Sequence, residues 1–227
     1  MKRAVLFDTE TTGLDPRTGD RVIEIAAVEL IDDLPTGRHY HVLLDPERDV
    51  PEEASRVHGY TRAHLVGQPK FAGVVDAFLA FVGDAPLIAH NAPFDFGFLD
   101  AELAKLDLAA LDRGRMVDTL ELARARFPGL PNSLDSLCRR YGIDLAERTT
   151  HNALLDCRLL AQVYLELMGG RQRGLALAVE EGGGLAGVSY AASVDRRPRL
   201  LVPDAQALQA HAAFVAKLKD AVWLQAG

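Results

Sequence analysis

Cysteine is scarce in this sequence, and apolar runs of membrane-spanning length are absent from it. The two cysteines, Cys138 and Cys157, lie in helix-like patterns without the spacing of metal ligands. We therefore expect buried, reduced thiols in a cytoplasmic protein. The apolar run at 4–7 is cut short by Asp8 and Glu10, so it does not have the length of a signal peptide or a membrane span.

The chain also lacks an excess of basic residues. Its 25 lysines and arginines are outnumbered by 32 acidic residues, and the formal net charge is −7. Proteins that hold nucleic acid over a broad surface use many Lys and Arg contacts to phosphates, so the charge argues against that class. Any contact with nucleic acid would be local, or assisted by a metal or a partner. The rest of the composition is ordinary, since 48% of the 227 residues are hydrophobic. A chain of this length and composition predicts one substantial domain and a tail.

The first apolar run leads directly into two acids. Residues 4–7 predict a strand covered on both faces, and a turn at 13–16 stops it. Asp8 and Glu10 would follow at the strand's end, on one face because strand side chains alternate, and two like charges held so close need a cation. Solvated surface acids fit the same spacing, so the choice depends on whether other acids occupy positions that should be apolar.

The next segments predict a mixed sheet. Residues 21–30 and 39–44 are rich in strand formers and are separated by turn signals at 32–37, which together predict an antiparallel meander. Residues 71–82 follow helical spacing, and a short strand is expected at 87–89. The order β-β-β-α-β predicts an α/β fold.

The following helix carries an acid on its apolar face. Pro93 suits a first helical turn, with Asn91 as a plausible cap. Asp95 has Phe98 and Leu99 at i+3 and i+4, so we expect its carboxylate to face the protein interior.

The same feature recurs further along the chain. A helix at 134–141 should end at Gly142, and another at 155–167 should end at Gly169. Asp156 falls beside the apolar stripe of the second of these helices. Two acids thus lie on faces that otherwise look like core.

The character of the chain changes after residue 170. Residues 171–198 have no periodic apolar face and predict a flexible linker. Beyond it, 199–202 could form a short strand, and Asp204 should cap a final helix with an apolar side. A single small helix cannot bury its own face, so we expect it to dock on something else.

Four carboxylates, Asp8, Glu10, Asp95 and Asp156, therefore converge in the predicted fold. Hard oxygen ligands of this kind suit Mg²⁺ or Mn²⁺, and four of them can hold two ions for phosphoryl displacement. His151 precedes Asp156 by five residues, and histidine titrates near neutral pH, which suits a general base for the attacking water. A lone histidine is more often structural, but the inward acid beside it favours the catalytic interpretation.

Three motifs, FDTETTG, HNAPFDFGFLD and HNALLDCRLL, resemble the DEDDh exonucleases of the ribonuclease-H-like fold. Further segments, including SRVHGYTRAHL and FPGLPNSLDSLCRRYGI, make residues 1–170 look like the proofreading exonuclease subunits of bacterial replicative DNA polymerases. The resemblance implies a mixed five-stranded sheet flanked by helices and 3′→5′ removal of nucleotides from DNA. It also implies metal-ligand roles for the four acids, with Asp8 between two ions, and a base role for His151.

The resemblance further implies a pocket for the terminal nucleotide. The matching positions are Thr11, Leu14, His90, Asn91 and Phe94. Other interpretations stay open for them: Leu14 and Phe94 would also fit a core, and the three polar residues would also fit turns or caps.

The linker and tail extend the resemblance to partners. Gln172, Leu175 and Leu177 resemble a short sliding-clamp motif, although Leu177 replaces the usual aromatic residue, so clamp binding and a plain linker both remain open. The segment 199–227, with Phe214 and Trp223, resembles the tail that docks on the polymerase alpha subunit.

Two rival functions are considered. A DEDDh exonuclease acting on RNA, of the ribonuclease T or oligoribonuclease type, would have the same chemistry, but the tail argues against it. A non-catalytic adaptor would keep the fold and predict the loss of at least one of the five catalytic positions, and none is lost.

Overall fold

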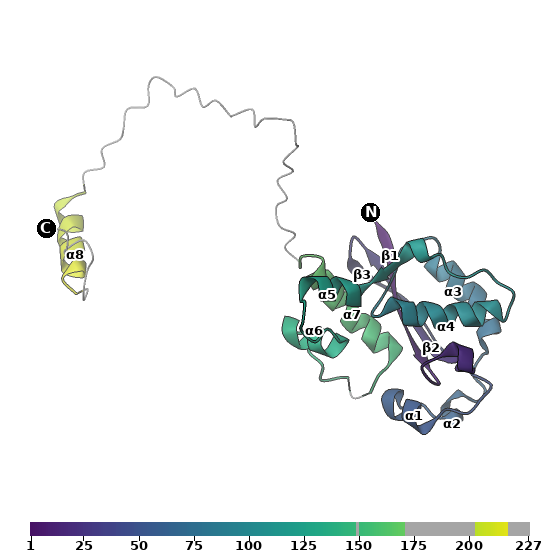
Figure 1. The fold of residues 1–227 in the computed structure, drawn as a ribbon. Helices are drawn as coiled ribbons and strands as arrows, with labels where there is room; N and C mark the ends of the chain where they lie inside the picture. Colours follow the sequence, from purple (N-terminus) through teal and green to yellow (C-terminus); the bar gives the residue numbers. More distant parts are fainter. Residues whose placement is uncertain (149, 171–202, 218–227) are drawn as a thin grey trace, which may run out of the picture. The chain divides into compact units, whose positions relative to one another are not determined.

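The computed structural model describes residues 1–148, 150–170 and 203–217 (Figure 1). The chain divides into two compact units, Met1–Ala176 and Leu177–Gly227. In the described part of the first unit, five strands form one mixed sheet in the order β3-β2-β1-β4-β5. The strands are β1 (Arg3–Thr11), β2 (Val22–Ile31), β3 (Leu34–Leu43), β4 (Leu87–Ala89) and β5 (Met116–Asp118). The α/β class and the five-stranded sheet are confirmed.

The central strand β1 is antiparallel to β2 and parallel to β4. Its pairing with β2 extends past both acids and places Glu10 opposite Glu24. Its pairing with β4 stops where Leu6 lies opposite Ile88. The prediction that the acids follow the strand's end is therefore wrong. Asp8 and Glu10 lie inside β1, just beyond the point where its pairing with β4 ends.

The antiparallel meander is confirmed, but its turn is shorter than predicted. β3 begins at Leu34, directly after Asp32 and Asp33, whose φ angles are 51° and 68°. Aspartate tolerates this left-handed conformation, so two residues are enough to reverse the chain. Pro35 and Gly37 therefore lie in β3, which is an edge strand, where a missing N–H is tolerated.

Helices cover both faces of the sheet (Figure 1). They are α1 (Glu52–His58), α2 (Arg62–Leu65), α3 (Val75–Val82), α4 (Ala92–Ala104), α5 (Thr119–Arg126), α6 (Leu134–Tyr141) and α7 (Ala153–Leu167). The predicted helix at 71–82 is divided into a 3₁₀ turn, η2 (Phe71–Gly73), and α3. Val5 and Phe7 pack in the core with α3 and α4, whereas Ala4 and Leu6 pack in the core with α6 and α7. Acids on α4 and α7 consequently approach β1 from opposite faces.

The helix starts differ from the predicted caps. Asn91 is left-handed, with φ 65°, and makes no side-chain capping bond, so the cap prediction is wrong. Instead, the backbone N–H groups of Asn91 and Ala92 donate to Asp118 Oδ1, at 2.9 and 3.3 Å. Asn152 caps α7, because its Oδ1 accepts from the backbone N–H of Leu155 at 3.0 Å. These bonds fix the starts of both acid-bearing helices.

Several smaller predictions are confirmed. Cys138 and Cys157 are buried and unbridged, and Gly142 ends α6 in the left-handed conformation. Within the described ranges, no helix combines the length and the apolarity of a membrane span.

The described part of the second unit contains one helix, α8 (Ala205–Val215). Asp204 caps it as predicted, through a bond from the backbone N–H of Ala207 at 2.7 Å. Leu208 and Phe214 are 54% and 61% exposed, so α8 presents apolar side chains without covering them itself. The predictions for Gln172, Leu175, Leu177, Trp223, the linker at 171–198 and the strand at 199–202 lie outside the described residues.

Candidate active site

Two of the predicted ligands stand on the face of β1 that turns toward α7. The alternation along β1 gives Asp8 and Glu10 the same face as Ala4 and Leu6. Glu10 is only 8% exposed, whereas Asp8 keeps part of its surface accessible. Because β1 and β4 are no longer paired beyond Leu6, the backbone of this part of β1 is accessible to side chains from α4.

Asp95 reaches β1 from the opposite face. It lies in the first turn of α4 and is 2% exposed. Its Oδ1 accepts hydrogen bonds from the backbone N–H of Thr9 at 3.0 Å and from the Thr9 hydroxyl at 2.7 Å. Thr9 separates the two β1 acids, so this pair of bonds holds the Asp95 carboxylate next to them.

Asp156 is held by an arginine that the sequence analysis missed. Arg148 Nε donates to Asp156 Oδ1 at 2.6 Å, and Nη2 donates to Oδ2 at 2.7 Å. The third nitrogen, Nη1, donates to Asp135 Oδ1 on α6 at 2.6 Å. This two-pronged pairing is the strongest geometry available to a guanidinium and a carboxylate, and it fixes the plane of the Asp156 side chain.

His151 completes the cluster at its solvent side. Its side chain is 48% exposed, and Nδ1 lies 3.4 Å from Asp156 Oδ2 and 3.0 Å from Arg148 Nη2. One ligand atom each from Glu10, His151 and Asp156 lie within 4.8 Å of one another. The structure therefore brings together all five residues predicted to be catalytic, and three of them are spaced as ligands of one ion would be.

The electrostatics of the cluster show an excess of negative charge. Burial, together with Asp95 and Glu10, raises the pKa of Asp8 well above its usual range. Burial and the nearby Glu24 raise the pKa of Glu10 to about 8. Burial raises the pKa of Asp95 to about 7, although the bonds from Thr9 oppose the shift. Such carboxylates ionise together only when cations join them.

Asp156 is the exception among the four acids. Burial acts to raise its pKa, but the hydrogen bonds from Arg148 and His151 outweigh burial and lower it. Asp156 is therefore oriented and favoured in its charged form, whereas burial and mutual repulsion disfavour the charged forms of the other three acids in the absence of a cation.

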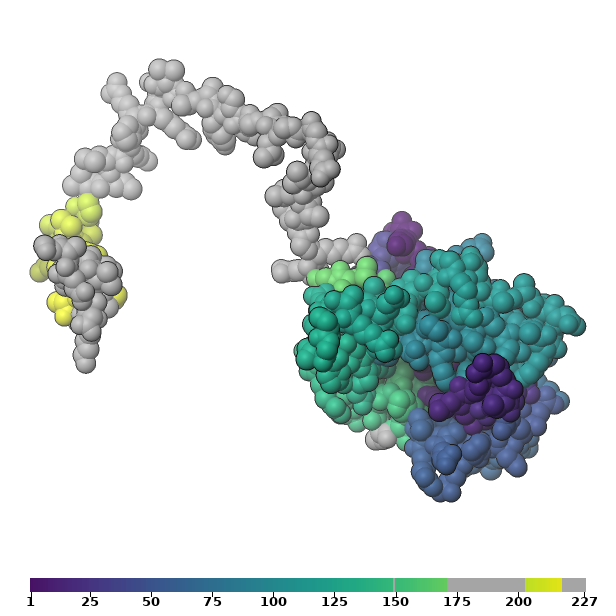
Figure 2. Space-filling model, in the orientation of Figure 1, coloured from purple at the N-terminus to yellow at the C-terminus, as the bar shows by residue number. Residues whose placement is uncertain are grey.

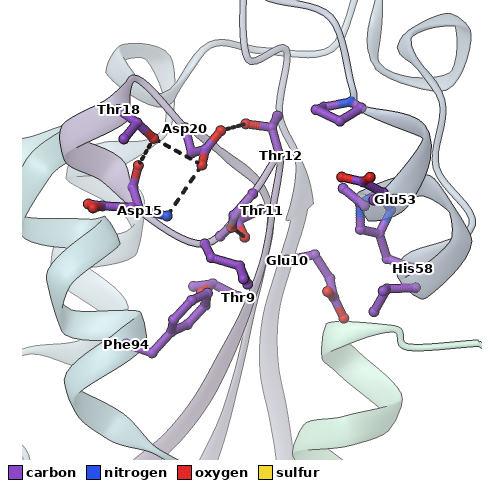
Figure 3. A pocket seen from close by; sticks show the side chains of 15 residues that line it. Thr9, Glu10, Thr11, Thr12, Asp15, Thr18, Asp20, Glu53, His58 and Phe94 are labelled. Atoms are coloured by element: carbon purple, nitrogen blue, oxygen red, sulfur yellow. Dashed lines mark hydrogen bonds between the residues drawn. The ribbon is translucent and has the colours of Figure 1, made fainter.

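A pocket of about 610 Å³ opens beside Glu10. Thr11, Leu14 and Phe94, three of the residues predicted to bind the terminal nucleotide, line it, and α1 contributes Val57 and His58. Figure 3 shows Phe94 and His58 on opposite sides of Glu10. In Figure 2 the purple surface of the 12–20 loop adjoins the blue surface of α1 and α2.

His58 is a pocket residue that the sequence analysis missed. It is 4% exposed, and its Nδ1 accepts the backbone N–H of Tyr60 at 3.1 Å. Burial lowers its pKa, which favours the neutral form of the ring. The quoted motif SRVHGYTRAHL contained His58, but a single histidine after a polar stretch gave no signal that it would reach a pocket.

Two predicted nucleotide-binding residues lie elsewhere. His90 Nδ1 is 2.9 Å from the Thr119 hydroxyl, and His90 lines a separate pocket with Arg124 and Asn132. Asn91 is exposed at the start of α4. The structure thus places three of the five predicted residues in the pocket beside Glu10, and places His90 and Asn91 outside it.

Comparison with known proteins agrees with this geometry. The model of a family described as Exonuclease matches residues 5–164. The chain is 42% identical over 221 residues to "DNA polymerase III subunit epsilon" of Rickettsia conorii, covering 95% of this chain and 96% of the relative. It is 45% identical over 187 residues to the protein of that name in Escherichia coli K12, covering 79% of this chain and 76% of the relative.

Solved structures agree at the level of the domain. Exonuclease X, determined in complex with 5′ overhanging duplex DNA, superposes with a TM-score of 0.58 at 27% identity, covering 74% of this chain and 91% of that one. Exonuclease I of E. coli, in a complex with single-stranded DNA and zinc, has a TM-score of 0.65 at 18% identity, covering 76% of this chain and 41% of that one, which supports the fold alone.

Proposed function

This chain belongs to the exonuclease family and, within it, to the epsilon subunits of DNA polymerase III, and we propose that the acidic cluster described above performs their proofreading reaction. The reaction is 3′→5′ hydrolysis that releases 5′-mononucleotides from a DNA end carrying a misincorporated nucleotide. The observation that carries the assignment is the convergence of four carboxylates and His151 beside a pocket large enough for one nucleotide.

The donor set fits divalent metal ions. Asp8, Glu10, Asp95 and Asp156 supply hard oxygen ligands, and the raised pKa values of three of them report negative charge that lacks a counter-ion. Two Mg²⁺ or Mn²⁺ ions held by these four carboxylates would supply the positive charge that activates water and stabilises the leaving oxygen in phosphodiester hydrolysis.

The side chains around these ligands have separate tasks. His151 accepts the proton of the attacking water, since it lies at the accessible side of the cluster next to Glu10 and Asp156. Arg148 holds the Asp156 carboxylate in one plane. Thr9 holds the Asp95 carboxylate against β1 in the same way.

The pocket receives the 3′-terminal nucleotide. Phe94 and Leu14 provide apolar surface for a base, and Thr11 and His58 stand at the boundary with the acids. His90 and Asn91 would contact the substrate outside this pocket, from the end of β4. Because the protein is acidic, recognition of the strand rests on this local pocket and on the ions rather than on a basic surface.

Recruitment is assigned to the rest of the chain. In this proposal residues 1–170 are the exonuclease domain, 171–198 a flexible linker, and 199–227 a tail that docks on the polymerase alpha subunit through Phe214 and Trp223. The exposure of Leu208 and Phe214 on α8 supports a partner for that helix. Gln172, Leu175 and Leu177 would contact the sliding clamp. A subunit of a bacterial replicative polymerase works in the cytoplasm.

The test compares substrates on the full chain. A 3′-labelled DNA primer with a mismatched end, a matched primer and an RNA of the same sequence are incubated with and without Mg²⁺ or Mn²⁺. The proposal expects metal-dependent release of 5′-mononucleotides, fastest from the mismatched DNA. Equal or faster degradation of RNA would support the rival RNA exonuclease, and absence of hydrolysis with either metal would refute the proposal.

A further inference from the structure

A buried glutamate next to the acidic cluster has no place in the proposed reaction. Glu24 lies on β2 directly opposite Glu10 and is fully buried. Its Oε1 accepts from Asn152 Nδ2 at 3.1 Å, and its Oε2 accepts from the backbone N–H of Ala153 at 3.2 Å. His41 Nε2 lies 2.6 Å from Oε1. Glu24 therefore anchors the first residues of α7 to the sheet.

Asn152 connects this anchor to the pocket wall. Its Nδ2 also donates to the Tyr60 hydroxyl at 3.1 Å, and Tyr60 lies just beyond Gly59, which ends α1. The Tyr60 ring stacks on His58, with ring centroids 5.6 Å apart. His58 lines the pocket, so the Asn152 side chain connects Glu24 on the sheet, through Tyr60, to the pocket wall.

A second connection runs through the backbone. The N–H of His151 donates to the carbonyl oxygen of Val57 at 3.0 Å. Val57 is another pocket residue on α1. The segment that carries His151 is thus attached to the pocket wall on one side and to Glu24 on the other, with few residues between the two attachments.

We propose that Glu24, Asn152 and Tyr60 are positioning residues that couple occupation of the nucleotide pocket to the placement of His151. The inference rests on the proposed function, since it assigns the nucleotide to this pocket and the base to His151. A nucleotide that packs against Val57 and His58 would fix α1, and the bonds through Tyr60 and Val57 would then fix His151 at the cluster. The half-exposed base would be held for reaction only when a nucleotide is present.

The kinetic test uses two variants that remove the hydrogen bonds of the link and change little else in the structure. Tyr60→Phe removes only the hydroxyl, and Asn152→Ser keeps an oxygen that can cap α7 but shortens the reach to Glu24 and Tyr60. Each should lower kcat by about one order of magnitude, within the range that misplacement of a catalytic group costs. The KM for a short single-stranded oligonucleotide should stay within about twofold.

Two further measurements separate positioning from stability. Mn²⁺ binding, measured by titration calorimetry, should be unchanged, because neither residue belongs to the acidic cluster. The matched control is Tyr40→Phe, which removes a half-buried hydroxyl bonded to the Val74 carbonyl at 3.4 Å, remote from the site. The proposal would be overturned if Tyr60→Phe and Asn152→Ser kept the wild-type kcat while their melting temperatures fell at least as far as that of Tyr40→Phe.

The coupling itself is read by hydrogen exchange. Thymidine 5′-monophosphate with Mg²⁺ should slow amide exchange in both 52–60 and 150–156 of the wild type. In Tyr60→Phe and Asn152→Ser it should slow exchange only in 52–60. Equal protection of 150–156 in all three proteins would mean that the nucleotide orders His151 without Tyr60 and Asn152, directly or through the Val57 carbonyl, and would overturn their role as the link. Because this measurement needs no cleavage, coupled protection in a wild type that hydrolyses no DNA would refute the proposed function alone.

Discussion

The acidic cluster and the pocket beside it share Glu10 but are held by different kinds of structure. The cluster stands on the interior of β1 and on the first turns of α4 and α7, and its orientation is fixed by bonds from Thr9 and Arg148. The pocket walls come from the 12–20 loop and from α1, which is only 7 residues long. The four acids thus lie on the central strand and on two long helices, whereas most of the pocket wall lies on a loop and on a short helix.

The energetic character of the two regions differs in the same way. The cluster collects like charges and raises the pKa values of Asp8, Glu10 and Asp95, so these acids stabilise the metal-free fold less as pH rises. In the pocket, by contrast, a hydrogen bond from Arg17 lowers the pKa of Asp15, and Leu14 at the rim is 85% exposed. Neutral substitutions of Asp8, Glu10 or Asp95 should therefore lower the rate without lowering the stability of the metal-free protein, whereas truncation of Leu14 at the pocket rim should mainly weaken binding.

The strongest way to test this contrast is Asp8→Asn. Activity should fall by more than about 10³-fold, because metal assistance contributes several kcal/mol to the barrier. The metal-free protein should melt at the same or a higher temperature than the wild type, since one member of a repulsive group has lost its charge. Activity is measured on a labelled oligonucleotide, and stability by calorimetry. Asp84→Asn, at an exposed position after α3, is the control. Near-wild-type activity in excess Mg²⁺ would contradict the assignment of the cluster.

The next largest effect is expected for His151→Ala. General-base assistance typically contributes about 10²–10⁴-fold, so kcat should fall by that order. Mn²⁺ affinity should be largely retained, because the four carboxylates remain. His39→Ala removes another exposed imidazole, on the edge strand β3, and should leave kcat unchanged. A loss below about threefold would assign His151 a structural role.

The acidic cluster was accessible from the sequence because its residues conflict with their surroundings. Asp95 and Asp156 occupy helix faces whose other members, such as Phe98 and Leu159, are buried. A buried acid at such a position is unfavourable unless it has a partner, and convergence with Asp8 on a shared metal site would provide that partner. The antiparallel meander and the buried cysteines followed from local sequence patterns in the same way.

Elements without a strong local pattern were missed. α1, α2 and β5 are short, and their stability comes from tertiary contacts rather than from their own sequence. The role of Arg148 could not be predicted from the sequence, because its partners, Asp135 and Asp156, lie on different helices. The misplaced Asn91 cap has the same origin, since its backbone N–H is satisfied by Asp118 at the end of β5.

The pocket side of the comparison is tested by Leu14→Ala. Leu14 contributes little to folding because it is 85% exposed, so the melting temperature should not change. A base in the pocket would cover this side chain, and losing about 1–2 kcal/mol of apolar burial should raise KM roughly 5- to 30-fold with kcat retained. Leu34→Ala, at a 52% exposed leucine on β3, is the matched control. A change in kcat without a change in KM would mean that the loop acts on the cluster rather than on the nucleotide.

The smallest expected effect is also the most direct measure of the charge conflict in the cluster. The pKa values of Glu10 and Asp95 are raised to about 8 and about 7 in the folded protein, from ordinary values of 4.5 and 3.8. A raised pKa means that the folded state binds protons more tightly than the unfolded state, so these groups contribute stability below pH 4 to 5 and lose it as pH rises through 7 to 8. Asp156 has the opposite shift, and its contribution is already constant above its ordinary pKa of 3.8.

The melting temperature of the metal-free protein should therefore fall by several degrees between about pH 5.5 and 8.5, at roughly 2–4 °C per kcal/mol for a chain of this size. Mg²⁺ or Mn²⁺ should restore the loss, and the increase they cause should grow with pH, because binding releases protons from the ligands. Glu10→Gln should flatten the slope, whereas Glu121→Gln, at an exposed position on α5, should leave it intact. A metal-free melting temperature that stays level or rises over this range would mean that the carboxylates are already compensated, and the contrast between a strained cluster and a relaxed pocket would not hold.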